Sequence, residues 1–477
     1  MTSIATIGSV ISVLITKTRI KLQLTPEPFE ILKNVKWGTL KGKELLETIT
    51  RAYDEIVTWR RNVFKLPTGK AGKSFLKELT TLFSLFNNDT PSKPISLTLI
   101  MIFCPLMLQK PSKNSKSKDH AKCLEYRLKL WEAGDLAGLL RDSRAIQARL
   151  LKGKRRHTDD HEKRFCRLML EGKVSAALKW VTERRAGILE ANQKVVDELL
   201  MKHPKAEPMH NDVALEGPHL LPPKVTYHPI DAQAIYLAAK NTNGAAGPSG
   251  IDADGWKRFL CSRSFGKETS NLCLAIAEFT RKVASENQDP DHLAPFTAAR
   301  LIPLDKGDGN HGVRPIGIGE VLRRIVGKAI IKLLKHDVAQ CTAPMQLCGG
   351  VKGGVEAAVH GLRAVWEDDE TEAVLLVDAR NAFNCMNRKT GLQNTGIVCP
   401  ELYTYLNNTY QKPSDLLVAG SKGLKIKSQE GTTQGDTTAM AFYALSLMKL
   451  NKSKMQRPKP QLPKKYSMLM MEQQVAS

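Results

Sequence analysis

Acidic residues are scarce in this chain. Its 477 residues include 48 Asp and Glu against 71 Lys and Arg, which gives a formal net charge of +23 and a pI near 9.6. Such an excess favours a polyanionic partner, with nucleic acid as the first candidate. A generally solvated basic surface is the alternative. Hydrophobic residues at 42% and charged residues at 25% indicate a globular rather than a disordered chain.

Paired cysteines are also lacking. The nine cysteines are an odd number, and they include no Cys-x-x-Cys and no nearby paired histidines. This pattern indicates neither a zinc module nor a disulfide framework. A reducing compartment fits it best. We therefore expect an intracellular protein, with nucleus and cytoplasm both open.

Long hydrophobic runs are absent as well. Residues 1–16 carry no charge, but the first cation, Lys17, follows the run, whereas a secretory signal has its cations in front. Residues 95–108 are apolar but contain Pro105 and are too short to cross a bilayer. We expect a buried core helix there and no membrane partner.

The length of the chain predicts two or three domains. Apolar residues recur at helical spacing within residues 40–90 and again within 165–200, and five prolines between residues 204 and 223 indicate a linker. We expect a helical region at 1–109, a basic helical region at 110–204, a Pro-rich linker at 205–228, two further regions at 229–345 and 346–450, and a basic, Lys- and Pro-rich disordered tail at 451–477.

Two segments are candidates for contact with phosphates. Residues 110–168 hold seventeen Lys and Arg against eight Asp and Glu, interleaved with apolar residues at helical spacing. Residues 321–335 predict a helix with one apolar and one basic face. A solvated helical face is the alternative in both segments. The candidate nucleic-acid contacts are Lys110, Lys113, Lys116, Lys118, Arg155, Arg156, Arg323 and Arg324.

Two loops punctuate the part of the chain before residue 320. Residues 243–252 are rich in glycine but lack the spacing of a P-loop, so by themselves they indicate a turn. Residues 300–306 and 313–316 are short extended runs joined by a glycine-rich, polar stretch. These two runs predict a β-hairpin.

The most informative stretch is an apolar run that ends in a carboxylate. Residues 374–377 predict a strand buried on both faces, and Asp378 follows directly. An aspartate held at the edge of the core suits Mg²⁺, although a helix cap or turn fits a single Asp as well. Some fifty residues later comes Gly-Thr-Thr-Gln-Gly-Asp at 431–436, and Asp436 then begins a predicted helix as its N-cap.

The ordered set of these motifs resembles the reverse transcriptases of non-LTR (LINE-like) retrotransposons. The set comprises the Gly-rich loop, Leu-Ile-Pro-Leu-Asp-Lys with Arg-Pro-Ile, Gln-Leu-Cys-Gly-Gly at 346–350 followed by Glu356 and His360, Leu-Val-Asp-Ala-Arg-Asn-Ala-Phe, and Gly-Thr-Thr-Gln-Gly-Asp. The resemblance covers about residues 244–450. It implies the fingers of a right-hand polymerase at 229–345 and a partial palm at 346–450.

The resemblance also implies an activity and its ligands. The activity is that of an RNA-directed DNA polymerase, a nucleotidyltransferase that uses Mg²⁺, an RNA template, a DNA primer and deoxynucleoside triphosphates. Asp378 matches the catalytic, metal-binding aspartate, with the Ala379 carbonyl beside it. Phe383 matches the aromatic residue that excludes a ribose 2′-hydroxyl. The other nucleotide-binding positions implied are Lys306, Arg314, Gln434 and Gly435.

One motif of that family is missing. Two Mg²⁺ ions about 3.5–4 Å apart need more than one carboxylate, and the family draws the others from an aromatic-Ala-Asp-Asp hairpin. Residues 449–477 contain no Asp, and their only acid is Glu472. We therefore expect a truncated, catalytically impaired copy. The alternatives are a non-enzymatic nucleic-acid-binding protein that uses its basic helical region, and a chain that does not fold stably because strand edges stay unpaired.

The fold class that we expect is α+β. A helical, basic N-terminal half should be followed by an antiparallel palm sheet with helices on one face.

Overall fold

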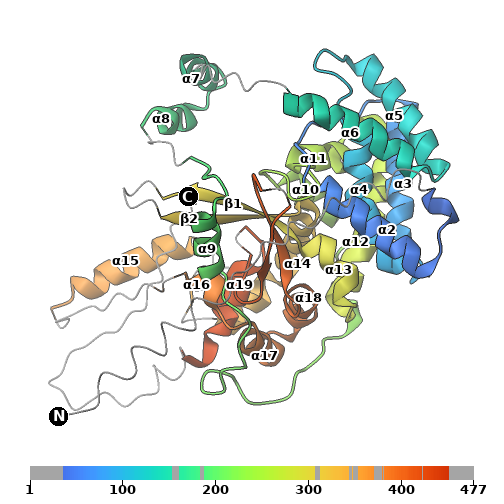
Figure 1. Cartoon of the computed structure of the whole chain (residues 1–477). Helices are drawn as coiled ribbons and strands as arrows, with labels where there is room; N and C mark the ends of the chain where they lie inside the picture. The colour runs from blue at the N-terminus through green and yellow to red at the C-terminus, as the bar shows by residue number, and fades with distance from the viewer. Residues whose placement is uncertain are drawn as a thin grey trace, which may run out of the picture.

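The described part of the chain is mostly helical, with one small sheet (Figure 1). The computed structural model describes residues 36–152, 161–182, 187–306, 312–342, 346–347, 353–369, 379, 381–421, 423–433 and 435–450. The predicted α+β class is confirmed. None of the described helices combines the length and the apolar character that crossing a membrane requires.

In the described residues 36–152, five α-helices form the helical part that we call the N-terminal half. They are α2 (Gly42–Ile56), α3 (Lys70–Asn87), α4 (Lys93–Leu108), α5 (Ser117–Glu132) and α6 (Leu136–Lys152), preceded by the short 3-10 helix η1 (Trp37–Thr39). The buried core helix predicted at residues 95–108 is α4, which continues through Pro105 and is buried on every side from Ile95 to Leu108.

The helical stretch expected at 165–200 consists of three short helices. They are α7 (His161–Leu170), α8 (Val174–Thr182) and α9 (Gln193–Met201). Gly172, at φ +69°, ends the turn after α7. Ile188 then forms an isolated antiparallel bridge with Leu304 of the sheet. The side chain of Asn192 accepts a hydrogen bond from Val195 N and so starts α9 afresh.

The Pro-rich segment at 205–228 is irregular, as predicted, until the 3-10 helix η2 (Lys224–Tyr227). It lies along helix α17 (Arg388–Val398) rather than spanning open solvent. His210 N donates to Thr390 Oγ1 at 3.0 Å, and Leu215 N donates to Asn394 Oδ1 at 2.7 Å.

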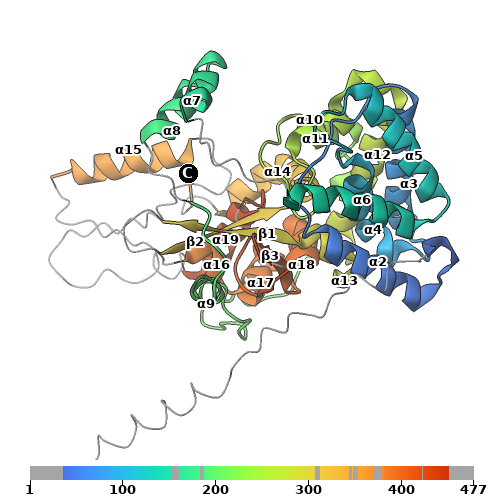
Figure 2. The ribbon, with the colours of Figure 1, turned by 45° about the horizontal axis from the view of Figure 1, so that its top comes forward.

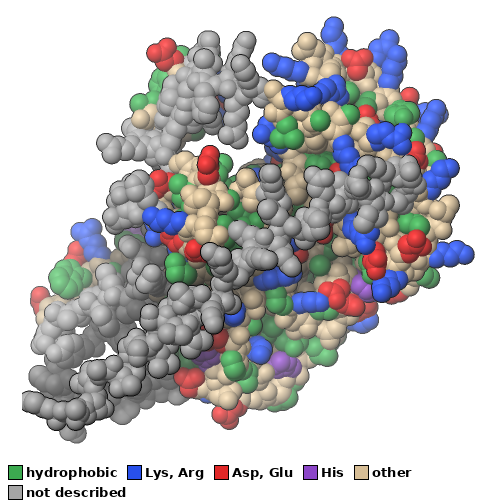
Figure 3. All heavy atoms as spheres, in the orientation of Figure 1, with side chains coloured by type: hydrophobic (Ala, Val, Ile, Leu, Met, Phe, Trp, Pro, Cys, Tyr) green, Lys and Arg blue, Asp and Glu red, His purple; other side chains and the backbone are tan. Residues whose placement is uncertain are grey.

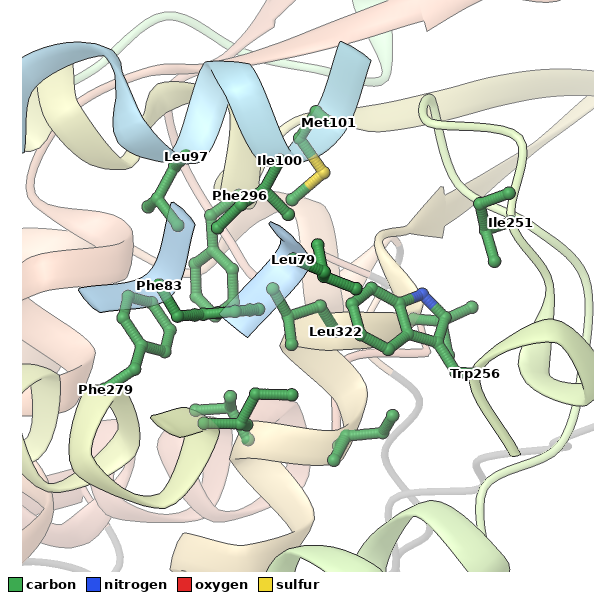
Figure 4. Packing of buried hydrophobic residues seen from close by; sticks show 14 of the residues in the cluster. Leu79, Phe83, Leu97, Ile100, Met101, Ile251, Trp256, Phe279, Phe296 and Leu322 are labelled. Carbon is green, nitrogen blue, oxygen red and sulfur yellow. The ribbon is translucent and has the colours of Figure 1, made fainter. Parts of the chain in front are cut away.

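The helices after this segment share one core with the N-terminal half. They are α10 (Ala232–Lys240), α11 (Ala253–Cys261), η3 (Arg263–Phe265), α12 (Lys267–Ser285), α13 (Pro290–Thr297) and α14 (Val321–Thr342). The ring of Phe279 lies 5.8 Å from that of Phe83 and 5.0 Å from that of Phe86, centroid to centroid. Figure 4 shows Leu322 of α14 in the same cluster. The core therefore runs across the boundaries expected at residue 110 and at 205–228.

The sheet has four strands in the order β2-β1-β3-β4. Strands β1 (Ala299–Asp305) and β2 (Val313–Gly319) pair antiparallel, with Ile302 opposite Ile316, which confirms the predicted hairpin. The expectation of a purely antiparallel sheet is wrong, because β3 (Ser414–Val418) runs parallel to β1. Strand β4 (Lys425–Ser428) pairs antiparallel with β3. The strand expected at 374–377 lies outside the described residues.

The remaining helices lie around and beyond this sheet. They are α15 (Gly354–Trp366), α16 (Ala382–Cys385), α17, α18 (Pro400–Tyr410) and α19 (Ala439–Ser446). Helix α15 extends away from the rest of the molecule in both Figure 1 and Figure 2. Helices α14 and α19 confirm that helices follow residues 321 and 436. The N-cap predicted at Asp436 is wrong, because α19 begins at Ala439 and its N-cap is Thr438.

Candidate functional site

The loop at 431–436 lies directly against the segment that carries Phe383. Thr432 N donates to Phe383 O at 2.5 Å, and Gly431 N donates to Met386 O at 2.7 Å. Gly431 has φ +68°, and a Cβ atom there would lie 2.0 Å from Phe383 O. Only glycine fits such an approach. The fold therefore brings together two motifs that are about fifty residues apart in the sequence.

A cavity of about 450 Å³ opens beside this junction. Ala379, Ala382 and Tyr443 are among the residues that line it. The ring of Phe383 is half-buried and packs 5.3 Å from the ring of Tyr443. Gly435, at φ +78°, is exposed, and a Cβ there would meet nothing within 4 Å. Asp378 and Gln434 lie outside the described residues.

Asp436 anchors the end of the loop in the core. Its carboxylate forms a buried ion pair with Arg323 Nη2 of α14 at 2.6 Å and accepts a hydrogen bond from Tyr410 Oη at 2.6 Å. Thr438 N and Oγ1 both donate to Asp436 Oδ1 at 3.0 Å. Burial disfavours the charged form of Arg323, but Asp436 outweighs it, so the pKa of Arg323 lies above its ordinary value.

This ion pair changes the interpretation of Arg323. Its side chain is only 2% exposed. The expectation that Arg323 contacts nucleic acid does not fit that burial, because its guanidinium forms an ion pair with Asp436 inside the protein. In this structure Asp436 and Arg323 position the loop at 431–436.

A second buried arginine, Arg388, also contacts the 431–436 loop, and the sequence analysis did not identify it. Arg388 Nε donates to Gly431 O at 2.8 Å, while Nη1 and Nη2 donate to Ser428 O and Oγ at 2.9 and 2.7 Å. Burial lowers the pKa of Arg388 to about 10. The guanidinium carbons of Arg323 and Arg388 lie 4.8 and 5.2 Å from the ring centre of Tyr410. An arginine next to an Asn N-cap, Asn387, is a weak signal in the sequence.

The described acidic side chains near the cavity accept hydrogen bonds from N–H groups, so these carboxylates are not free to bind a metal ion. Glu430, 5% exposed, accepts from Glu207 N and from Arg388 N, each at 2.7 Å. Glu207 Oε2 lies 3.2 Å from His210 Nε2. Across the described parts of the chain, no group of three or more His, Cys, Asp and Glu side chains could hold a metal ion. The described residues alone therefore do not form a site for a pair of Mg²⁺ ions.

Lys306 and Arg314 lie at the end of the β1–β2 hairpin where its two strands are connected. Both side chains are exposed, and Lys306 N donates to Gly312 O at 2.9 Å to close the last rung. The loop at 431–436 contacts the other end of β2, because Thr433 Cγ2 lies 3.6 Å from the position of a Cβ on Gly317. Strand β2 thus links Arg314 to the loop, and Lys306 lies beside it at the end of β1.

The Gly-rich loop at 243–252 is fixed to the start of α14. Ser249 N and Oγ donate to the buried carboxylate of Glu320 at 2.6 and 2.7 Å. Burial raises the pKa of Glu320 to about 7. Arg324 Nη1 donates to Asn243 O at 2.8 Å, and Nη2 donates to Ala245 O. Arg324, expected to contact nucleic acid, therefore holds this loop.

The other candidate phosphate contacts lie at the start of α5. Lys113, Lys116 and Lys118 are exposed and Lys110 is half-buried, while Arg155 and Arg156 lie outside the described residues. Figure 3 shows Lys and Arg side chains spread over the helical half of the molecule.

Comparison with known proteins adds no family to this geometry. No family model matches the chain, and a search of curated proteins finds no match either.

Proposed function

We propose that residues 244–450 form a reverse-transcriptase-like domain, descended from an RNA-directed DNA polymerase of a retroelement. The observation that carries the proposal is the junction of the 431–436 loop with the Phe383 segment, held by two backbone hydrogen bonds. A polymerase needs these two motifs side by side, because one holds the metal-binding aspartate and the other borders the nucleotide. The cavity lined by Ala379 would take the deoxynucleoside triphosphate.

Phe383 would select the sugar. Its half-buried ring packs on Tyr443 next to the cavity, so it is held in place on one side. A fixed ring that fills the space of a 2′-hydroxyl discriminates by steric clash. The exposed cations of the hairpin, Lys306 and Arg314, would contact the triphosphate of the nucleotide.

The same chain has few acids left for catalysis. The acids in residues 381–450 are Glu401, Asp415, Glu430 and Asp436. Asp436 pairs with Arg323, Asp415 Oδ1 lies 2.5 Å from Lys427 Nζ, and Glu430 accepts two backbone N–H groups. Glu401 lies in the first turn of α18. We therefore propose that this polypeptide binds template and nucleotide but adds nucleotides poorly, since three of these four carboxylates are already engaged within the protein.

The test separates nucleotide binding from chemistry. Equilibrium binding of dTTP and of its ribose counterpart should favour dTTP in the unaltered protein, and Phe383→Ala should abolish that preference while leaving overall folding intact. Tyr443→Phe, which keeps the ring that supports Phe383, is the matched control. Equal binding of both sugars by the unaltered protein would contradict the nucleotide site.

Primer extension on an RNA template with Mg²⁺ tests the chemistry. We expect little extension, with no further loss in Asp378→Ala. Robust extension that Asp378→Ala abolishes would refute the impairment and would strengthen the assignment to the enzyme class.

A second candidate function is non-enzymatic nucleic-acid binding. Lys113, Lys116 and Lys118 favour it, because their exposed side chains form no ion pair with any acid in the described parts of the chain. Filter binding of RNA should then weaken as salt rises, by about 0.7 log units per log unit of salt for each phosphate contact to a single strand. Affinity that does not change with salt would contradict this function.

A further inference from the structure

A groove separate from the 431–436 site runs beside the extended segment at 63–68. It consists of two adjoining cavities of about 540 and 630 Å³, which share residues 63–66 and Arg258 among their walls. The start of α5 closes one cavity and α11 closes the other. No residue of this groove also lines the cavity beside Ala379. We call it the 63–68 groove.

Cations outnumber acids along the 63–68 groove. Lys65 is exposed and Lys110 is half-buried, and in the described parts of the chain neither ammonium has an ion pair or hydrogen bond. Arg258 is held rigid, because Nε donates to Leu66 O at 3.2 Å and its guanidinium lies 5.0 Å from the Phe265 ring centre. These three charges converge on one concave surface, which concentrates positive potential there.

The acids of the 63–68 groove do not cancel this charge. Asp252 is paired with Arg61, which also lines the groove. Asp254 is exposed, and Lys257 lies beside it in the wall with its ammonium on Asn243 Oδ1 at 2.6 Å. The balance of the groove stays positive, so its ligand should be an anion.

An aromatic pair lies in the same wall. The rings of Phe64 and His120 stack at 4.5 Å between centroids with 8° between their planes. Burial, and next the charge of Lys110, lower the pKa of His120, which keeps its ring neutral at physiological pH. A flat, neutral, half-exposed ring next to cations is the combination that single-stranded nucleic acids use, with bases on rings and phosphates on Lys and Arg.

We propose that the 63–68 groove binds a single strand of nucleic acid. Phosphates would lie near Lys65, Lys110 and Arg258, and a base would lie against His120. The two adjoining cavities together give room for a short single strand. The aromatic pair favours nucleic acid over an acidic peptide, which has carboxylates but no bases to stack. The proposal takes its ligand class from the proposed function but requires no nucleotide addition.

Fluorescence anisotropy of a labelled uridine oligonucleotide, with the full chain and no nucleotide triphosphate, tests this. Lys65→Ala combined with Lys110→Ala removes two phosphate contacts. The matched control is Lys41→Ala with Lys43→Ala, two exposed lysines that line neither cavity. The slope of log affinity against log salt should become shallower by about 1.4 in the groove variant. Between about 1 M and about 0.1 M salt, the affinity of the groove variant should therefore rise about 25-fold less than that of the unaltered protein. The control should keep its slope.

His120 gives an independent readout. His120→Ala should weaken binding about fivefold or more, the loss of one stacked base, with an unchanged salt slope. His120→Phe should restore it. Lys65→Arg with Lys110→Arg should likewise keep the affinity of the unaltered protein.

Several results would overturn the proposal. One is an equal loss in the groove and control variants, which would mean general surface charge. A second is displacement of the oligonucleotide by polyglutamate with the same lysine dependence, which would mean an acidic-peptide site. A third is displacement by inorganic triphosphate at equal concentration, together with affinity that does not depend on oligonucleotide length, which would mean a free-nucleotide pocket. If the oligonucleotide binds through the groove but the protein does not bind dTTP, the proposed function is contradicted and the inference about the groove still holds.

Discussion

Replacing Gly431 by alanine should destabilise the protein more than any other glycine change in the same loop. The new Cβ would lie 2.0 Å from Phe383 O and 2.4 Å from Asn384 Cα, both of them backbone atoms that cannot rotate away. Positive φ costs an alanine about 1–2 kcal/mol. The overlap adds about 1–3 kcal/mol, because the loop and the Phe383 segment must separate. The total loss in free energy of unfolding should be about 2–5 kcal/mol.

Gly435→Ala is the matched control for this change. Gly435 has nearly the same backbone conformation, φ +78°, but a Cβ there meets nothing within 4 Å. It should therefore lose only the conformational part, about 1–2 kcal/mol. Urea unfolding followed by tryptophan fluorescence measures both. Equal losses in the two variants would refute the close contact between the two motifs.

Two further predictions concern buried charges. Arg323→Met should destabilise the protein by about 3–5 kcal/mol, because it leaves Asp436 buried without its partner. Adding Asp436→Asn should recover part of this loss. A double variant whose loss of stability equals the sum of the two single losses would contradict the pairing. Burial raises the pKa of Glu320 from 4.5 to about 7, although Arg300 and Arg324 favour its charged form. Between these two pH values the folded protein binds more protons than the unfolded chain. The free energy of unfolding should therefore fall by about 3 kcal/mol as the pH rises from 4.5 to about 7. Glu320→Gln should remove that part of the pH dependence of urea unfolding, and an unchanged profile would show that the titration belongs to another group.

Local patterns in the sequence predicted those elements whose cause is local. The apolar stripe from residue 321 predicts α14, and two extended runs around a glycine-rich tip predict the β1–β2 hairpin. The parallel pairing of β1 with β3 was missed, because its partners are more than a hundred residues apart and no local pattern encodes which edge a strand joins. The break between α7 and α8 was missed because apolar periodicity continues through Gly172, where the chain turns.

The site shows the same division. The structure brings the 431–436 loop onto the Phe383 segment, two motifs that the resemblance assigns to one site. The burial of Arg323 could not be predicted, since a lysine or arginine in a helix is ordinarily exposed and its partner, Asp436, lies more than a hundred residues later. Arg388 escaped notice for the same reason. The roles of Asp378 and Gln434 stay predictions.

The shared aromatic core has a consequence for synthesis on the ribosome. Phe86 emerges about 190 residues before its partner Phe279. At about 5–20 residues per second, the nascent N-terminal helices wait about 10–40 s with that ring uncovered. During this interval we expect the unfinished polypeptide to expose an aromatic surface that molecular chaperones bind. We expect its first half to become resistant to proteases only after α12 has been translated.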